Sequence, residues 1–287
     1  MMTFTQQLQA AERRNDSLLC IGLDPEPARF PGAWQGDASR IFDFCAAIVD
    51  ATQDLAIAFK PQIAYFAAHR AEDQLERLIG HIHRVAPAVP VILDAKRGDI
   101  GPTAALYAQE AFERYQADAV TLSPFMGLDS IAPWQRHAGK GLFLLCRTSS
   151  PGGSDLHAQR LLGADGQPGD LLYEHIARLA AGPWNHGGQL GLVVGATFPA
   201  EIERVRALAP TLPLLIPGVG AQGGDATTTV RAGWRGLADG AGGQHRSTGA
   251  VVVNSSRAVL YASSGADFAQ AARAVADQTR QALNAGR

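Results

Sequence analysis

Two acidic residues and a lysine follow one apolar segment of this sequence, in the order Asp94-Ala95-Lys96-Arg97-Gly98-Asp99. The segment before them, 90–93, has the β-branched and aliphatic residues typical of a buried strand. Side chains two residues apart share a face of a strand, so we expect Asp94 and Lys96 to point the same way. A lysine beside carboxylates stays cationic, which suits it to give a proton to a carbanion. An ion pair that only caps the strand is the structural alternative.

Charged residues also end two earlier apolar segments. Asp24 follows the segment 18–23, and Lys60 ends the segment 56–60. Charges at the ends of buried strands are costly unless they are paired or used. If Asp24 and Lys60 converge with Asp94 and Lys96, the four groups titrate together and form a candidate catalytic site.

Eight short apolar segments must position these residues, and they are continuous rather than alternating, as in parallel strands covered on both faces. We predict strands over 18–23, 56–60, 90–94, 119–122, 141–146, 191–194, 213–216 and 250–253. Helical spacing of apolar residues predicts helices over 39–55, 71–85, 102–115 and 200–208. Eight β/α units predict an α/β fold, a (β/α)8 TIM barrel, with residues 1–287 as one domain. An open Rossmann-like sheet is the alternative.

A glycine-rich segment follows the seventh predicted strand, with the sequence Pro217-Gly218-Val219-Gly220-Ala221-Gln222-Gly223-Gly224. Glycine lets backbone N–H groups approach an anion, and barrels often bind phosphate with the loops after strands seven and eight. Arg257, just past the eighth strand, can add a bidentate charge. The segment also matches the dinucleotide-binding pattern, but the glycine-broken stretch after it argues against a βαβ unit. A purely structural turn is the other alternative.

Two connections are long. The connection 149–190 begins at the carboxyl end of a strand, contains a predicted helix near 170–181 and is a candidate lid. The connection 233–249 joins a helix to the last strand, so we expect it on the opposite face, away from the chemistry.

Composition narrows the classes of function. The formal net charge is -2, so no basic excess indicates a nucleic-acid partner. No stretch has the length of a membrane span, and the N-terminal residues lack the apolar centre of a signal peptide. Three widely spaced cysteines argue against a disulfide framework or a zinc site, and a reducing cytoplasm is the expected location. We expect no metal.

Together these residues resemble the orotidine 5'-phosphate decarboxylase family, in its longer bacterial (type 2) branch. The most specific match is Asp94-x-Lys96-x-x-Asp99 followed by Ile100 and Thr103. Independent support comes from Gly22-Leu23-Asp24, Phe59-Lys60-Pro61-Gln62, Ser149-x-Pro151-Gly152, the glycine-rich segment and Asn254-Ser255-Ser256-Arg257.

The resemblance implies a cofactor-free carboxy-lyase that converts orotidine 5'-phosphate to uridine 5'-phosphate, the last step of UMP synthesis. Lys96 would protonate C6 of the pyrimidine, and Asp94 would lie beside the substrate carboxylate. Lys60 would orient the acids and contact the ribose, with Asp24 near the ribose hydroxyls.

The remaining implied contacts complete the substrate site. Ser149 would bind the pyrimidine, and the phosphate would be held by Pro217, Gln222, Gly223, Gly224 and Arg257. The resemblance also implies a homodimer with shared active sites, in which the partner's site is reached by Asp99, Ile100 and Thr103.

Two other functions remain open. Metal-dependent sugar-phosphate decarboxylases and aldolases of the same superfamily share the Asp-x-Lys-x-x-Asp motif, although Asp24-Pro25 and the Ser149 loop favour the cofactor-free enzyme. The other possibility is a barrel that binds nucleotides without catalysis.

Overall fold

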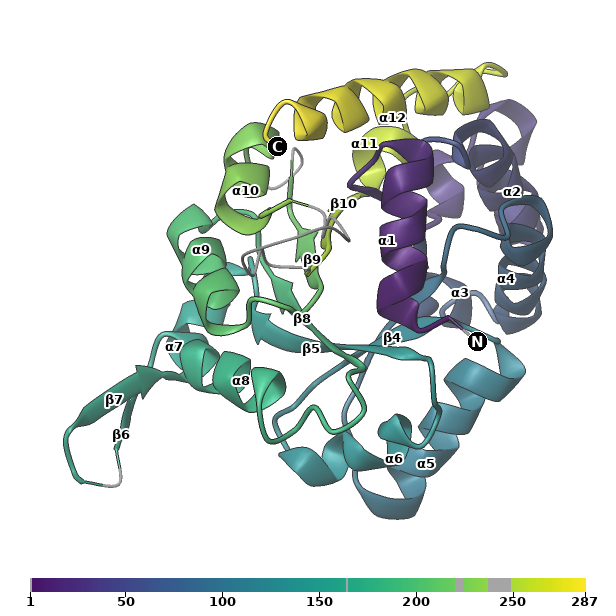
Figure 1. Ribbon diagram of the computed structural model, residues 1–287. Coiled ribbons are helices and arrows are strands. Elements are labelled where there is room, and N and C mark those ends of the chain that lie inside the picture. The colour runs from purple at the N-terminus through teal and green to yellow at the C-terminus, as the bar shows by residue number, and fades with distance from the viewer. Residues whose placement is uncertain (1, 164, 220–223, 237–248) are drawn as a thin grey trace.

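Eight parallel strands form the barrel of this computed structural model, which describes residues 2–163, 165–219, 224–236 and 249–287 (Figure 1). The strands are β1 (Leu19–Leu23), β2 (Ala58–Pro61), β3 (Ile92–Arg97), β4 (Ala119–Leu122), β5 (Gly141–Arg147), β8 (Leu190–Val194), β9 (Leu214–Pro217) and β10 (Val251–Ser255). They pair in the order β2-β1-β10-β9-β8-β5-β4-β3. Parallel bridges from Phe59 to Val91 and from Gln62 to Asp94 join the two ends of this sheet. The predicted TIM barrel is therefore confirmed, and the open sheet is wrong.

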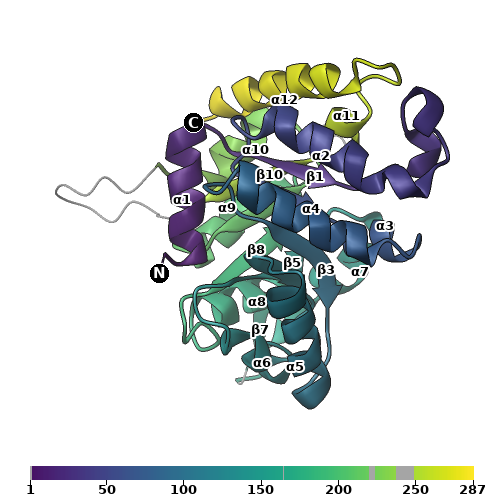
Figure 2. The same ribbon diagram turned by 90° about the vertical axis from the view of Figure 1, so that its right-hand side faces the viewer.

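Helices surround the strands, and each predicted helix is present with its bounds shifted by a few residues. The longer helices are α2 (Ile41–Thr52), α4 (Glu72–Val85), α5 (Gly101–Gln109), α8 (Leu172–Ala181), α9 (Pro199–Leu208), α10 (Ala226–Gly233) and α12 (Phe268–Asn284). The helix α5 continues as a π-helical turn over Glu110–Arg114. Short helices are α3 (Ile63–Ala67), α6 (Ala132–Gln135), α7 (Ser154–His157) and α11 (Arg257–Leu260). Figure 2 shows α2 and α4 side by side on the outside of the barrel.

One further helix, α1 (Phe4–Asn15), covers the base of the barrel, where the strands begin. Phe4 and Leu8 are buried in a cluster with inward-facing strand residues, and the Phe4 ring meets Phe143 edge-on with ring centroids 5.7 Å apart. Any side chain at Gly141 would overlap the Phe4 ring, so glycine is required where the helix lies against β5. Sequence reasoning did not predict this helix.

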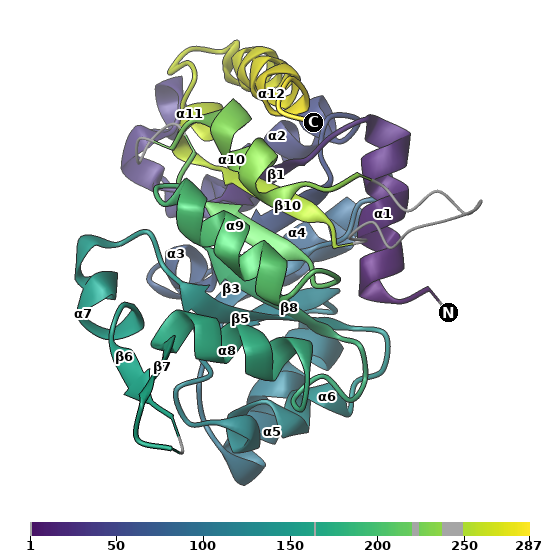
Figure 3. The same cartoon turned by 60° about the vertical axis from the view of Figure 1, so that its left-hand side comes forward.

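The candidate lid contains an antiparallel hairpin that sequence reasoning also missed. Its strands β6 (Arg160–Leu162) and β7 (Pro168–Leu171) lie between α7 and α8 and project from the barrel (Figure 3). Most of the other long connection, residues 237–248, lies outside the described residues.

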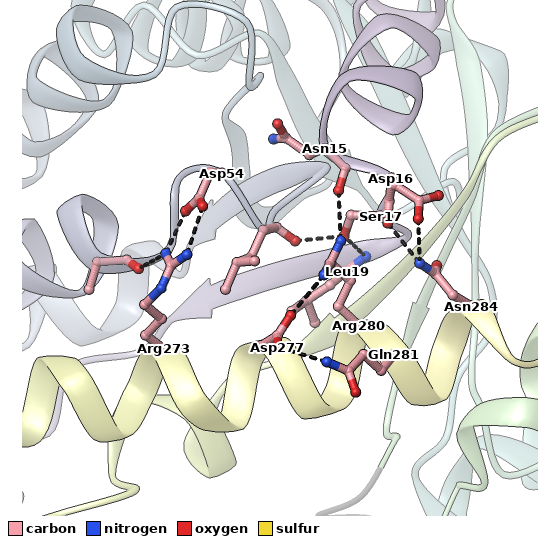
Figure 4. A network of polar contacts seen from close by, with 12 residues as sticks. Asn15, Asp16, Ser17, Leu19, Asp54, Arg273, Asp277, Arg280, Gln281 and Asn284 are labelled. Atoms are coloured by element: carbon pink, nitrogen blue, oxygen red, sulfur yellow. Dashed lines mark hydrogen bonds and ion pairs between the residues drawn. The ribbon is translucent and has the colours of Figure 1, made fainter.

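A set of hydrogen bonds ties α12 to the base of β1 and β2, and we call it the base network (Figure 4). Arg273 makes two contacts with Asp54, at 2.6 and 2.8 Å, and its side chain is 46% exposed. Arg280 donates to the backbone oxygen of Asn15, and Asn284 donates to that of Asp16. These contacts hold the C-terminal helix against the start of the first strand.

Two further predictions concern membranes and cysteines. In the part of the chain that the structure describes, no helix combines the length and apolarity needed to span a bilayer. Cys20, Cys45 and Cys146 are free and buried, and burial raises the pKa of the Cys20 thiol to about 12.

Candidate active site

Three predicted residues meet at the mouth of the barrel, where β2 and β3 end. The Asp94 carboxylate lies between two ammonium groups: Oδ2 is 2.9 Å from Lys60 Nζ, and Oδ1 is 2.6 Å from Lys96 Nζ. The Lys60 side chain is only 5% exposed, whereas the Lys96 side chain is 46% exposed. We call these three residues the charged triad. Its buried half is fixed by β2 and β3, and its exposed end can meet a ligand.

The Asp94 and Lys96 side chains meet as expected, but a bulge in β3, and not regular strand spacing, creates this arrangement. Leu93 pairs with Val120 of β4, but the next pair is Arg97 with Leu122. Three residues of β3 therefore face one residue of β4, and Lys96 adopts a left-handed backbone with φ of 46°. In a residue other than glycine, this conformation raises the free energy by on the order of 1–3 kcal/mol. It persists only where the surrounding structure enforces it.

Thr121, the residue of β4 that faces the bulge, holds it in place. Its hydroxyl accepts the backbone N–H groups of Ala95 and Lys96, each at 3.0 Å, and donates to Asp94 Oδ1 at 2.9 Å. The residue is 1% exposed. Sequence reasoning missed Thr121, although a polar residue inside the apolar segment 119–122 was the available signal.

Asp94 and Lys60 keep their charges because the effect of their charged partners outweighs that of burial. Burial alone would raise the pKa of Asp94, but Lys60 and Lys96 hold that pKa well below its usual range. Burial alone would lower the pKa of Lys60, but the carboxylates of Asp94 and Asp24 raise it above its ordinary value. The mouth therefore carries a buried anion between two cations.

Asp24, at the end of β1, lies near Lys60 and leaves one oxygen without a hydrogen-bond partner. Its Oδ1 is buried, as are the unpartnered Oδ1 of Asn254, in the adjacent strand β10, and Oγ of Ser256, just after that strand. Buried polar atoms without partners are rare, and at a mouth they indicate groups that await a ligand. Asn254 and Ser256 were noted in the sequence without a role.

Ser149 begins the loop that follows β5, and Arg147 anchors this loop. Arg147 is 2% exposed and donates to Glu201 Oε2 at 2.6 Å and to Ser154 Oγ at 2.9 Å. A Cβ on Gly195 would come within 2.7 Å of Ser149 backbone atoms, so the glycine directly after β8 makes room for the loop. Sequence reasoning missed the anchoring role of Arg147.

The predicted phosphate segment is described only at its two ends. Pro217 ends β9, Gly218 has a φ of 103°, and Val219 pairs with Gly224. A Cβ on Gly224 would lie 2.6 Å from the Ala196 Cβ, so glycine is required there. Gln222 and Gly223 lie outside the described residues, so their predicted contacts are not tested.

The last four predicted site residues do not contact the Asp94 carboxylate of the charged triad. Arg257 is exposed at the first position of α11. Asp99 accepts the backbone N–H of Ile100 at 2.8 Å, and Ile100 is 49% exposed. Thr103 is exposed in the first turns of α5. Ile100 and Thr103 therefore face outward, as a contact with a second subunit requires.

Among the described ranges, no group of three or more His, Cys, Asp or Glu side chains could hold an ion.

Comparison with known proteins agrees with this geometry. The family model described as "Orotidine 5'-phosphate decarboxylase / HUMPS family" matches residues 17–275. This chain belongs to that family. The orotidine 5'-phosphate decarboxylase of Polaromonas naphthalenivorans (strain CJ2) is 73% identical over 286 residues, which cover 100% of this chain and 97% of the relative. That of Albidiferax ferrireducens is 72% identical over 287 residues, which cover 100% and 99%.

Solved structures place the fold in the same family. The structure of Leishmania donovani OMP decarboxylase has a TM-score of 0.78 and 38% sequence identity, and the match covers 99% of both chains. The orotidine 5'-monophosphate decarboxylase of Methanocaldococcus jannaschii shares the fold at a TM-score of 0.63 and 19% identity, over 91% of this chain and 97% of that one. Membership in this family, in its type 2 branch, agrees with the resemblance that the motifs indicated.

Proposed function

We propose that this chain converts orotidine 5'-phosphate to uridine 5'-phosphate and carbon dioxide, with the charged triad as its catalytic centre. The curated relatives that carry this activity in their names are 68–73% identical to the chain over nearly its whole length. The observation that carries the assignment of the centre is the position of Asp94, between one buried and one accessible ammonium group.

The chemistry requires charge stabilisation. When the bond between C6 and the carboxylate breaks, carbon dioxide leaves and the electron pair stays on a ring carbon. An ammonium group aimed at that carbon stabilises the developing charge without rearranging, which is the largest single contribution in many enzymes. Lys96 supplies this group, since its side chain remains accessible at the mouth.

Proton transfer completes the reaction. The Lys96 Nζ–H bond breaks as a C6–H bond forms, which leaves a neutral amine that regains a proton from water. Asp94 orients the Lys96 ammonium before the step, through its 2.6 Å contact. Lys60 holds the other oxygen of Asp94, so the carboxylate cannot rotate away.

The other residues bind parts of the substrate that do not react. Asp24 contacts the ribose hydroxyls, and its unpartnered oxygen is the available acceptor. Ser149 contacts the pyrimidine, and the phosphate is held by Pro217, Gln222, Gly223, Gly224 and Arg257. Binding energy from the phosphate, remote from C6, can be used to hold the reacting groups in place.

The enzyme acts as a homodimer in which Asp99, Ile100 and Thr103 complete the partner's site. The outward position of Ile100 and Thr103 supports this arrangement. Mixing inactive Asp99→Ala chains with inactive Lys96→Ala chains should restore part of the activity, because one of the two mixed sites then carries neither substitution. Activity that stays absent after subunit exchange would indicate a self-contained subunit.

A direct assay tests the function. The purified protein is incubated with orotidine 5'-phosphate, and the loss of its ultraviolet absorbance is followed with and without EDTA. We expect turnover at the same rate in both samples. Turnover that EDTA abolishes would favour a metal-dependent relative, and nucleotide binding without turnover would indicate a non-catalytic barrel.

A further inference from the structure

The bulge in β3 leaves two backbone N–H groups that the barrel cannot pair. Between the pairs Leu93–Val120 and Arg97–Leu122, β3 advances four residues while β4 advances two. The ladder therefore has no backbone acceptor in β4 for the N–H groups of Ala95 and Lys96, and both donate to the Thr121 hydroxyl instead. A buried backbone N–H group without a partner is strongly disfavoured, so the hydroxyl is what permits this bulge.

The same contacts fix the direction of the hydroxyl proton. A hydroxyl has one proton to donate and two lone pairs to accept with. Because the N–H groups of Ala95 and Lys96 occupy the lone pairs of Thr121, the proton goes to Asp94 Oδ1. One side chain thus sets the backbone of Lys96 and the orientation of the carboxylate that holds the Lys96 ammonium.

Among the described residues, the other non-glycine residues with positive φ are Asp16, Arg70 and Gln116. Asp16 caps the end of α1, Arg70 follows α3, and Gln116 follows the π-helical turn after α5. Left-handed residues are common where helices end. Lys96 differs, since it lies in a strand and its conformation depends on a side chain from the neighbouring strand.

We propose that Thr121 is a positioning residue for decarboxylation, which places the Lys96 ammonium by holding the β3 bulge. This inference rests on the proposed function. Thr121 does not touch the substrate; it acts through Lys96 and Asp94. Its loss should therefore lower the rate of the chemical step and leave nucleotide binding nearly unchanged.

The test compares three variants. Thr121→Val keeps the shape of the side chain and removes the hydroxyl, so we expect kcat to fall on the order of 10²-fold, the effect of a displacement of about 1 Å. KM and the Kd for uridine 5'-phosphate should stay within a few-fold of the wild type. Thr121→Ser restores the hydroxyl and should recover most of kcat. Thr121→Cys has nearly the shape of serine but only a weak hydrogen-bonding group, so it should resemble valine.

The control is Thr52→Val in α2. Thr52 is also fully buried, and its hydroxyl donates to the backbone of Ile48, far from the mouth. This variant reports the effect of losing a buried threonine hydroxyl on stability alone, and its kcat should match the wild type.

The outcomes separate the two proposals. A wild type that does not consume orotidine 5'-phosphate overturns the proposed function. An active wild type with a normal kcat in Thr121→Val overturns the positioning role. If Thr121→Val does not fold, the serine and cysteine variants decide, because equal kcat values in these two variants would overturn the role.

Discussion

The charged triad at the mouth and the base network both contain ion pairs, but these two clusters use different cations. The base network relies on arginine, in the pairs Arg273–Asp54 and Arg280–Asp277. The chain has only three lysines, and two of them, Lys60 and Lys96, lie in the charged triad. Arginine offers a rigid fork and does not release its proton in proteins, whereas lysine can give one up. In these two clusters, arginine makes the fixed contacts of α12, and a lysine, Lys96, is the proposed source of a transferable proton.

Exposure separates the two regions as well. The Arg273–Asp54 side chains are 46% and 58% exposed, and such pairs contribute about 0–1 kcal/mol. The Lys60 and Asp94 side chains are only 5% and 10% exposed. Removal of one partner would leave a buried charge without its counter-charge and lower the free energy of unfolding by about 3–5 kcal/mol.

The largest expected effect follows from replacing Lys96 with arginine. Lys96→Arg keeps a positive charge beside Asp94 but removes the transferable proton, so we expect kcat to fall by at least about 10²–10⁴-fold. Fold and melting temperature should change little, because the side chain is 46% exposed. Decarboxylation assays and thermal unfolding check both parts. A near-normal kcat would exclude Lys96 as the proton donor.

Replacing Lys60 with methionine should lower the stability of the fold as well as the activity. Asp94 would keep only the exposed ammonium of Lys96, so we expect the free energy of unfolding to fall by about 3 kcal/mol. Lys140→Met is the matched control, since Lys140 lies at the base, 27% exposed, and contacts a backbone oxygen. Urea unfolding measures both variants, and equal losses would contradict the contrast between mouth and base.

The pH dependence of stability should distinguish Asp94 from Asp54. Both pKa values are lowered in the folded state: that of Asp94 by Lys60 and Lys96 against the effect of burial, and that of Asp54 by its hydrogen bonds from Arg273. A lowered folded pKa gives stability above the unfolded value of about 3.9, and this stability is lost as the pH falls through the folded pKa. At neutral pH the free energy of unfolding of the wild type should be clearly larger than that of Asp94→Asn. This difference in free energy should shrink only in strong acid. Asp54→Asn should show a much smaller difference when the same acid series is followed by urea unfolding.

The smallest effect is expected at the base. Arg273→Lys retains the charge but loses the two-point contact with Asp54, so the free energy of unfolding should change by less than about 1 kcal/mol. Turnover should equal that of the wild type. A loss of turnover in this variant would mean that the base network influences the geometry of the active site at the mouth.

The barrel could be predicted from the sequence because all eight strands are continuous apolar segments. In a parallel barrel, the carboxyl ends of all the strands lie at the same mouth. Lys60, Asp94 and Lys96 could be placed together on that ground alone. Thr121 could not, because its role depends on the register between β3 and β4, which the spacing within one strand does not contain. For the same reason the left-handed backbone of Lys96 was not foreseen.

Elements outside the β/α repeat were also missed. The helix α1 carries many charged and amide side chains, and only a few of its residues, among them Phe4 and Leu8, are buried. The hairpin of β6 and β7 is short and largely exposed, so it lacks the apolar pattern by which strands are detected.

The packing of α1 has a consequence for how the molecule is assembled. Its buried face lies in a cluster with Phe143 of β5 and Val252 of β10, so its docking surface is complete only when the last strand has joined the barrel. During synthesis, α1 leaves the ribosome before the eight strands, so it must wait until β10 has been made before it can dock. The helix that closes the base of the barrel is therefore made before the strands it covers, but it can pack only after all of them.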